Sequence, residues 1–98
     1  MIIHSEYITG TTAAGALSLN TQESLMGVVR EIIVIPATGS TSYNLEITND
    51  NSLVVFSSSS ITGSFIEEVA LPFRGIYTVS ISSATNDELF KINLVVEE

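Results

Sequence analysis

The feature that most constrains the fold of this chain is a set of short runs in which every second residue is apolar. In residues 77–82, Tyr77, Val79 and Ile81 alternate with threonine and serine, and residues 90–96 repeat the pattern. A period of two places apolar side chains on one face of a β-strand and polar ones on the other. Isoleucine and valine, which are frequent in these runs, are β-branched and suit the pleated surface of a sheet. The pattern therefore predicts an all-β protein.

Turn residues divide the chain into successive strands. We expect strands at residues 2–9, 17–20, 27–35, 43–48, 53–56, 64–70, 77–82 and 90–96. The turn at 49–52 closes one hairpin, and the turn at 84–88 closes a second one between 77–82 and 90–96. A chain of 98 residues with about seven or eight strands predicts a single antiparallel β-sandwich, Ig-like or jelly-roll-like.

Two stretches are expected to interrupt the strands. The serine run at residues 57–60 is typical of a solvated loop. Pro72 is expected to end the strand before it, because proline lacks the N–H that a strand ladder needs, and Gly75 gives the turn its freedom. Tyr77, which begins the next strand, is expected to bond its hydroxyl to the backbone upstream, as in the tyrosine corner of Ig-like sandwiches.

The N-terminal segment, residues 1–16, ends in a stretch of small residues that precedes the sandwich domain at residues 17–98. Two interpretations fit it. The segment is an arm that adds a strand to a neighbouring subunit, or it is the first strand of the same sandwich. Proteolysis before Gly15 in the free protein would indicate the arm.

Apolar residues also suggest where the chain meets a partner. The strand at 27–35 is apolar on both faces, which is typical of a central strand or of one whose outer face a partner covers. Arg74 lies in the expected turn, where it is either solvated or in contact with an acidic neighbour. The candidate interaction residues are Ile2, Ile3, Tyr7, Ile8, Val28, Ile32, Val34 and Arg74.

The charge of the chain limits its partners. Its net charge is −8, and its three basic residues, Arg30, Arg74 and Lys91, are scattered. Phosphate recognition needs clustered Lys and Arg, so the sequence indicates no nucleic-acid and no membrane partner. The acidity serves solubility or complements a basic protein surface. The mean hydropathy of +0.42 is high for a small domain and favours burial of apolar surface against partners.

No pattern in the chain is typical of catalysis or of a cofactor site. Cysteine is absent and His4 is the single histidine, which excludes His/Cys metal clusters. Neighbouring carboxylates such as Glu67 and Glu68 point to opposite faces of a strand and cannot converge on one bond. The residues 48–52 are rich in oxygen but favour an Asx turn over a Ca²⁺ site. We therefore expect a protein that is not an enzyme and holds no cofactor or metal.

Residues 15–98 resemble the small β-sandwich virion proteins of tailed bacteriophages, of the capsid decoration or cement type. The matching elements are GALSLNTQESLMGVVREIIVIPAT, YNLEITNDNSLVVF, TGSF with EVALPF, and GIYTVSISSATNDELFKINLVVEE. The resemblance implies a non-enzymatic homo-oligomer, with a trimer as the first candidate, that binds and stabilises the assembled head. Its implied partner is the major capsid protein, and its place is the virion, assembled in the host cytoplasm. A complete chain without a signal peptide is expected.

Two alternatives remain open. The protein is a neck, tail or head-fibre component of the same particle, or it is an Ig-like adhesion or ligand-binding module, since GIYTVSIS is also common in bacterial Ig-like modules. Such a module would bind its ligand through the loops at 37–42, 57–63 and 83–88. An accessory domain of an enzyme is a third possibility.

Overall fold

The computed structural model describes residues 3–21 and 25–98 of the chain. The described residues form eight β-strands and no helix, which confirms the predicted all-β sandwich. The strands are β1 (Ile3–Thr11), β2 (Leu17–Asn20), β3 (Leu25–Pro36), β4 (Ser42–Thr48), β5 (Val54–Thr62), β6 (Phe65–Gly75), β7 (Thr78–Ser82) and β8 (Leu89–Glu97). The described part of the chain contains no helix long and apolar enough to cross a membrane.

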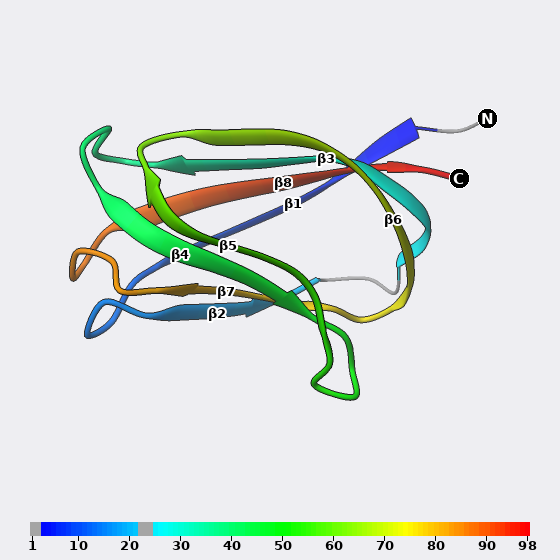
Figure 1. Ribbon diagram of the computed structural model, residues 1–98, viewed down its shortest axis with the longest axis horizontal. Coiled ribbons are helices and arrows are strands. Elements are labelled where there is room, and N and C mark those ends of the chain that lie inside the picture. Colours follow the sequence, from blue (N-terminus) through cyan, green and yellow to red (C-terminus); the bar gives the residue numbers. More distant parts are fainter. Residues whose placement is uncertain (1–2, 22–24) are drawn as a thin grey trace.

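The strands form two antiparallel sheets of four, which lie one above the other in Figure 1. The first sheet has the order β1-β8-β3-β6 and the second the order β2-β7-β4-β5. Except for β4 and β5, strands that follow each other in sequence lie in different sheets. This order is that of a jelly roll and differs from the strand order of an Ig-like sandwich. The structure therefore selects the jelly roll from the two predicted architectures.

One predicted hairpin is confirmed and the other is wrong. β4 and β5 pair as expected, and their turn is held by Asn49, whose Oδ1 accepts the backbone N–H of Asn51 at 2.9 Å and of Leu53 at 3.0 Å. β7 pairs with β2 and β4, whereas β8 pairs with β1 and β3. Residues 83–88 cross between the sheets, so the alternation was right but the pairing of neighbouring strands was not.

The core lies between the two sheets and consists of the inward side of the alternating runs. Val79 and Ile81 from β7 and Ile92, Leu94 and Val96 from β8 are almost fully buried there. The rings of Tyr43 and Phe90 meet edge to face with centroids 5.0 Å apart. Because these two residues belong to different sheets, their contact joins the two layers.

β1 extends the first sheet at its edge. It pairs with β8 along its whole length, from Ile3 opposite Glu97 to Thr11 opposite Leu89, and Ile8 is buried in the core. The beginning of β1 and the end of β8 therefore lie at the same end of the sandwich, as Figure 1 shows. Residues 3–11 occupy this position in the isolated chain, and exchange of the strand between subunits stays a prediction.

Two expected interruptions lie inside strands. Pro72 lies within β6, opposite Val28, and does not end the strand. β6 is the edge strand of its sheet, where a proline without an N–H is tolerated. The serine run 57–60 lies within β5, the edge strand of the other sheet, so the predicted loop is wrong. The chain bends instead after Gly75, and there the Tyr77 hydroxyl accepts the Arg74 backbone N–H at 2.8 Å, as predicted.

A bulge in β3 changes which side chains face outward. The register shifts between Val29 and Glu31 against both neighbouring strands. On the β6 side two residues, Val69 and Ala70, lie opposite one residue of β3, whereas on the β8 side the extra residue is Arg30. The Arg30 guanidinium forms two bonds to the Glu97 carboxylate, from Nε at 3.2 Å and from Nη2 at 3.3 Å. The bulge expected near residues 67–68 therefore occurs on β6 directly after them, at residues 69–70.

Candidate functional site

The outer side of the sheet β1-β8-β3-β6, which we call the apolar face, carries a continuous row of large side chains. In this row Tyr7 lies opposite Asn93, Asn93 opposite Ile33, and Ile33 opposite Ile66, so that all four strands contribute. Tyr7 is 52% exposed and Ile66 is 65% exposed, while Ile33 and Asn93 are half-buried by their neighbours. A row of this kind leaves apolar area in water unless something covers it.

The apolar face continues towards the end of the sandwich that holds residues 83–88. Ile35 and Leu89 add two more exposed apolar side chains there. Together with Pro36, Ala37 and Lys91 they line a shallow depression of about 260 Å³. The row and the depression together form one extended apolar surface on a single sheet.

The charged residues of the apolar face are balanced. All three basic residues of the chain lie on its strands, with their side chains exposed. Three carboxylates accompany them, and one of these, Glu97, pairs with Arg30 at 3.2 Å. The six residues are Arg30, Arg74, Lys91, Glu31, Glu68 and Glu97. The tertiary structure thus collects on one sheet the cations that are scattered in sequence.

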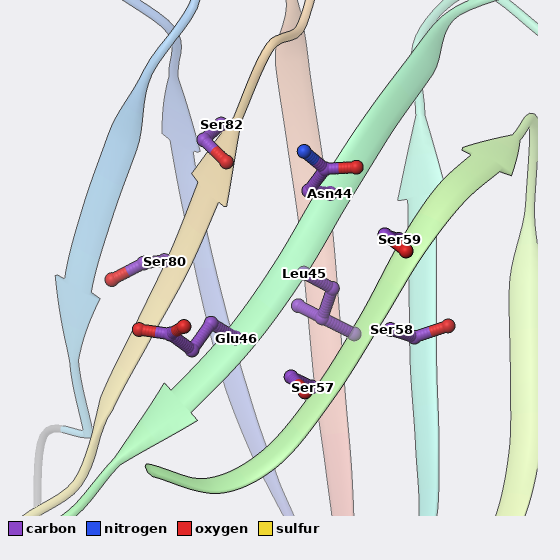
Figure 2. Close-up of a pocket in the computed structure, with 8 residues that line it drawn as sticks. All are labelled: Asn44, Leu45, Glu46, Ser57, Ser58, Ser59, Ser80 and Ser82. Carbon is purple, nitrogen blue, oxygen red and sulfur yellow. The ribbon is translucent and has the colours of Figure 1, made fainter. Parts of the chain in front are cut away.

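The outer side of the other sheet is polar and carries a shallow trough of about 370 Å³, shown in Figure 2. Its small side chains leave the space that larger ones would fill. Glu46 is the charged residue of the lining and lies next to Ser80 on β7 and Ser57 on β5. Asn44 holds the edge strand through its Oδ1, which accepts the backbone N–H of Ser60 at 2.9 Å. The lining residues are Asn44, Leu45, Glu46, Ser57, Ser58, Ser59, Ser80 and Ser82.

The remaining polar groups of note serve the fold. Burial raises the pKa of Tyr43 to about 12, and its hydroxyl donates to the Gly63 carbonyl at 2.7 Å. The buried Glu88 accepts the Thr38 backbone N–H at 2.5 Å. No group of three or more His, Cys, Asp or Glu residues that could hold a metal ion occurs among the described residues.

The predicted interaction residues divide between surface and core. Ile3, Tyr7, Val28 and Arg74 all lie on the apolar face, where Ile3 and Val28 flank Glu97 in one row. Ile8, Ile32 and Val34 point the other way and are buried in the core, so they are not available to a partner of the folded chain. Ile2 lies outside the described residues.

Several residues of the apolar face were not predicted. The sequence could not distinguish Ile33 and Ile35 from Ile32 and Val34, because the whole segment is apolar and does not indicate which side chains face outward. Ile66 was hidden because it precedes two glutamates on an edge strand. The signal in the sequence is the alternation of residues 90–96, which places Lys91 and Asn93 on the polar face of their strand. Once the pairing of β8 with β3 is known, the residues opposite them share this face.

Comparisons with known proteins establish the fold and leave the function open. No protein-family model matches the chain, and no curated protein sequence matches it. The Yersinia pseudotuberculosis-derived mitogen superposes with a TM-score of 0.59 at 11% identity, over 99% of this chain and 89% of the mitogen. A chitosan-binding module of a chitosanase/glucanase from Paenibacillus sp. IK-5 gives a TM-score of 0.54 at 14% identity, over 91% of this chain and 76% of the module.

A phage-derived protein is also among the similar structures. The SPBc2 prophage-derived protein YomS superposes with a TM-score of 0.48 at 19% identity, over 97% of this chain and 96% of that protein. At these identities the likeness concerns the β-sandwich alone, and unrelated functions share such folds.

Proposed function

We propose that this chain is a non-enzymatic structural protein of a tailed-phage particle, a capsid decoration protein that binds and stabilises the assembled head. The observation that carries the proposal is the apolar face, whose exposed row spans all four strands of a sheet. Exposed apolar surface of this extent is typical of a chain that works inside an assembly. The proposed location is the virion, and the proposed partners are further copies of the chain and the major capsid protein.

Two further observations support a place in a particle. The jelly-roll strand order is common in viral capsid domains, although lectin domains use it too. The resemblance of residues 15–98 to decoration proteins supports a phage particle as this assembly. A neck, tail or head-fibre protein would need the same covered face and is the alternative within the virion.

The test is cosedimentation with phage heads assembled from the capsid gene nearest to this one. Wild-type protein is expected to pellet with the heads. Ile66→Glu puts a charge into the apolar row and is expected to abolish pelleting. Leu53→Glu is the matched control, because Leu53 is 62% exposed against 65% for Ile66 but lies next to the turn between β4 and β5. Wild-type protein that stays in the supernatant, or equal binding by both variants, would refute the proposal.

A second candidate function is a ligand-binding module that uses the polar trough. The trough offers hydroxyls, an amide and one carboxylate on an open surface, and the fold is shared with a chitosan-binding module. This candidate places the ligand on a sheet and not on the loops at 37–42, 57–63 and 83–88. A cationic, hydroxyl-rich chain such as a chitosan oligosaccharide would suit Glu46.

Titration calorimetry with chitosan oligosaccharides tests this candidate. Glu46→Gln is expected to weaken binding, and Glu67→Gln on β6 is the control that removes the same charge elsewhere. No heat of binding to the wild-type protein would exclude this ligand.

A further inference from the structure

We infer that a second copy of this chain covers the apolar face, with the two sheets packed face to face about a two-fold axis. The inference rests on the proposed function only because both need the face to be covered. The first argument is the distribution of charge. The three basic and three acidic residues of the face cancel, so the eight other acidic residues carry the whole net charge of −8. Two copies therefore meet on this face without the repulsion that opposes contact elsewhere.

The second argument is the order of the charges along the strands. Lys91 lies on one side of the Tyr7–Ile66 row, at the level of Ile35. Glu31 lies on the other side, at the level of Val95, with Glu68 opposite it on β6. In the proposed dimer the two-fold axis lies between the apolar faces of the two copies and runs perpendicular to their strands. The strands of the second copy therefore run in the opposite direction to those of the first. This arrangement places each Lys91 over the acidic side of the second copy, nearest to Glu31.

The third argument is the row itself, which such an axis maps onto its own copy. Tyr7, Ile33 and Ile66 then pack against their equivalents, which removes the exposed side chains of Tyr7 and Ile66 from water. Asn93 lies in the middle of the row, and its Oδ1 is buried without a hydrogen-bond partner among the described residues. In the pair the two Asn93 amides face each other, and a rotation of the side chain lets one donate to the other. A single polar residue of this kind fixes the register of an apolar contact.

The face is large enough for a stable contact. Four strands at a spacing of about 4.8 Å, each about 30 Å long, present roughly 550 Å² per copy. A pair would bury about 1,100 Å², slightly more than the roughly 1,000 Å² that specific interfaces need. Because an isologous contact uses the same surface on both copies, it closes at two. The inference therefore replaces the trimer with a dimer.

The experiment is a charge exchange followed by sedimentation velocity over a wide range of concentration. Wild-type protein is expected to form a dimer. Lys91→Glu and Glu31→Lys are each expected to weaken the dimer about tenfold, because each turns two attractions into repulsions. The double variant is expected to recover most of the loss. Within one chain the two residues are about 13 Å apart along the strands, so recovery requires contact between copies.

Two further variants distinguish loss of the contact between copies from loss of folding. Ile66→Glu is expected to be monomeric with an unchanged circular dichroism spectrum, whereas Leu53→Glu stays dimeric. A wild-type monomer at every concentration, a trimer, or a double variant as weak as the single ones would overturn the inference. A monomer that pellets with heads would leave the proposed function standing, with capsid protein on the face. A dimer that does not pellet with heads would support the inferred dimer and refute the proposed function.

Discussion

Thr12→Val tests how the connection between β1 and β2 is attached to the sandwich. The Thr12 hydroxyl donates to the Thr85 carbonyl at 2.6 Å and accepts the Glu88 backbone N–H at 2.8 Å. Thr12 is 2% exposed and Glu88 is 6% exposed. Valine has nearly the same shape, so the substitution removes the two bonds and leaves the packing in place.

The magnitude follows from what is left unpaired. A hydrogen bond contributes about 1 kcal/mol net, and a buried donor left without a partner costs about 1–3 kcal/mol. Thr85 is an exposed residue whose carbonyl can accept from water instead, whereas the Glu88 N–H is buried and cannot. We therefore expect the free energy of unfolding to fall by about 2–3 kcal/mol, from a total of about 5–15 kcal/mol for a domain of this kind. The melting temperature should fall by roughly 10–20 °C.

Urea denaturation and thermal melting at one low protein concentration measure the loss. Thr11→Val is the matched control, because Thr11, the last residue of β1, directly precedes Thr12 and is exposed. It should change the free energy of unfolding by less than about 0.5 kcal/mol. If Thr12→Val and Thr11→Val unfold at the same midpoint, the hydroxyl does not hold the connection and the reasoning is wrong.

Three other changes test the packing and the ionisation of buried groups. Tyr77→Phe removes the acceptor of the Arg74 N–H and should lower the free energy of unfolding by about 1 kcal/mol in urea; an unchanged midpoint would remove the role of its hydroxyl. Gly63→Ala should cost at least about 1–3 kcal/mol, because its φ is +74° and an added Cβ would lie 2.7 Å from the Gly39 carbonyl oxygen, whereas Gly39→Ala meets open space and should be neutral. Burial raises the pKa of Tyr43 from 10.0 to about 12, so the folded state holds this proton more tightly than the unfolded chain. The stability it contributes is full below pH 10 and should be lost as the pH rises towards about 12, a decline that urea titrations of Tyr43→Phe should not show.

Local signals were sufficient where the partner strand is near in sequence. The β4–β5 hairpin was predicted because Asn49 supplies an Asx turn between two alternating runs. The pairing of β7 with β8 was not predictable in this way. Their connection is short, but β7 lies between β2 and β4, and that choice depends on strands distant in the sequence. Pro72 and the serine run were misread for the same reason, since both are tolerated on edge strands and edges exist only once the sheets are assembled.

The sequence by itself determined the fold class, the number of strands and, in β4, β7 and β8, which side chains face the core, because a period of two assigns faces without knowledge of partners. It did not determine the faces of β3, where apolar residues occupy both sides and a bulge at Arg30 shifts the pattern. Only the tertiary structure decided that β3, β6 and β8 share a sheet with β1. That arrangement brings Arg30, Arg74 and Lys91 onto one surface with the exposed apolar row, and it occurs because strand order is set by long-range pairing and packing.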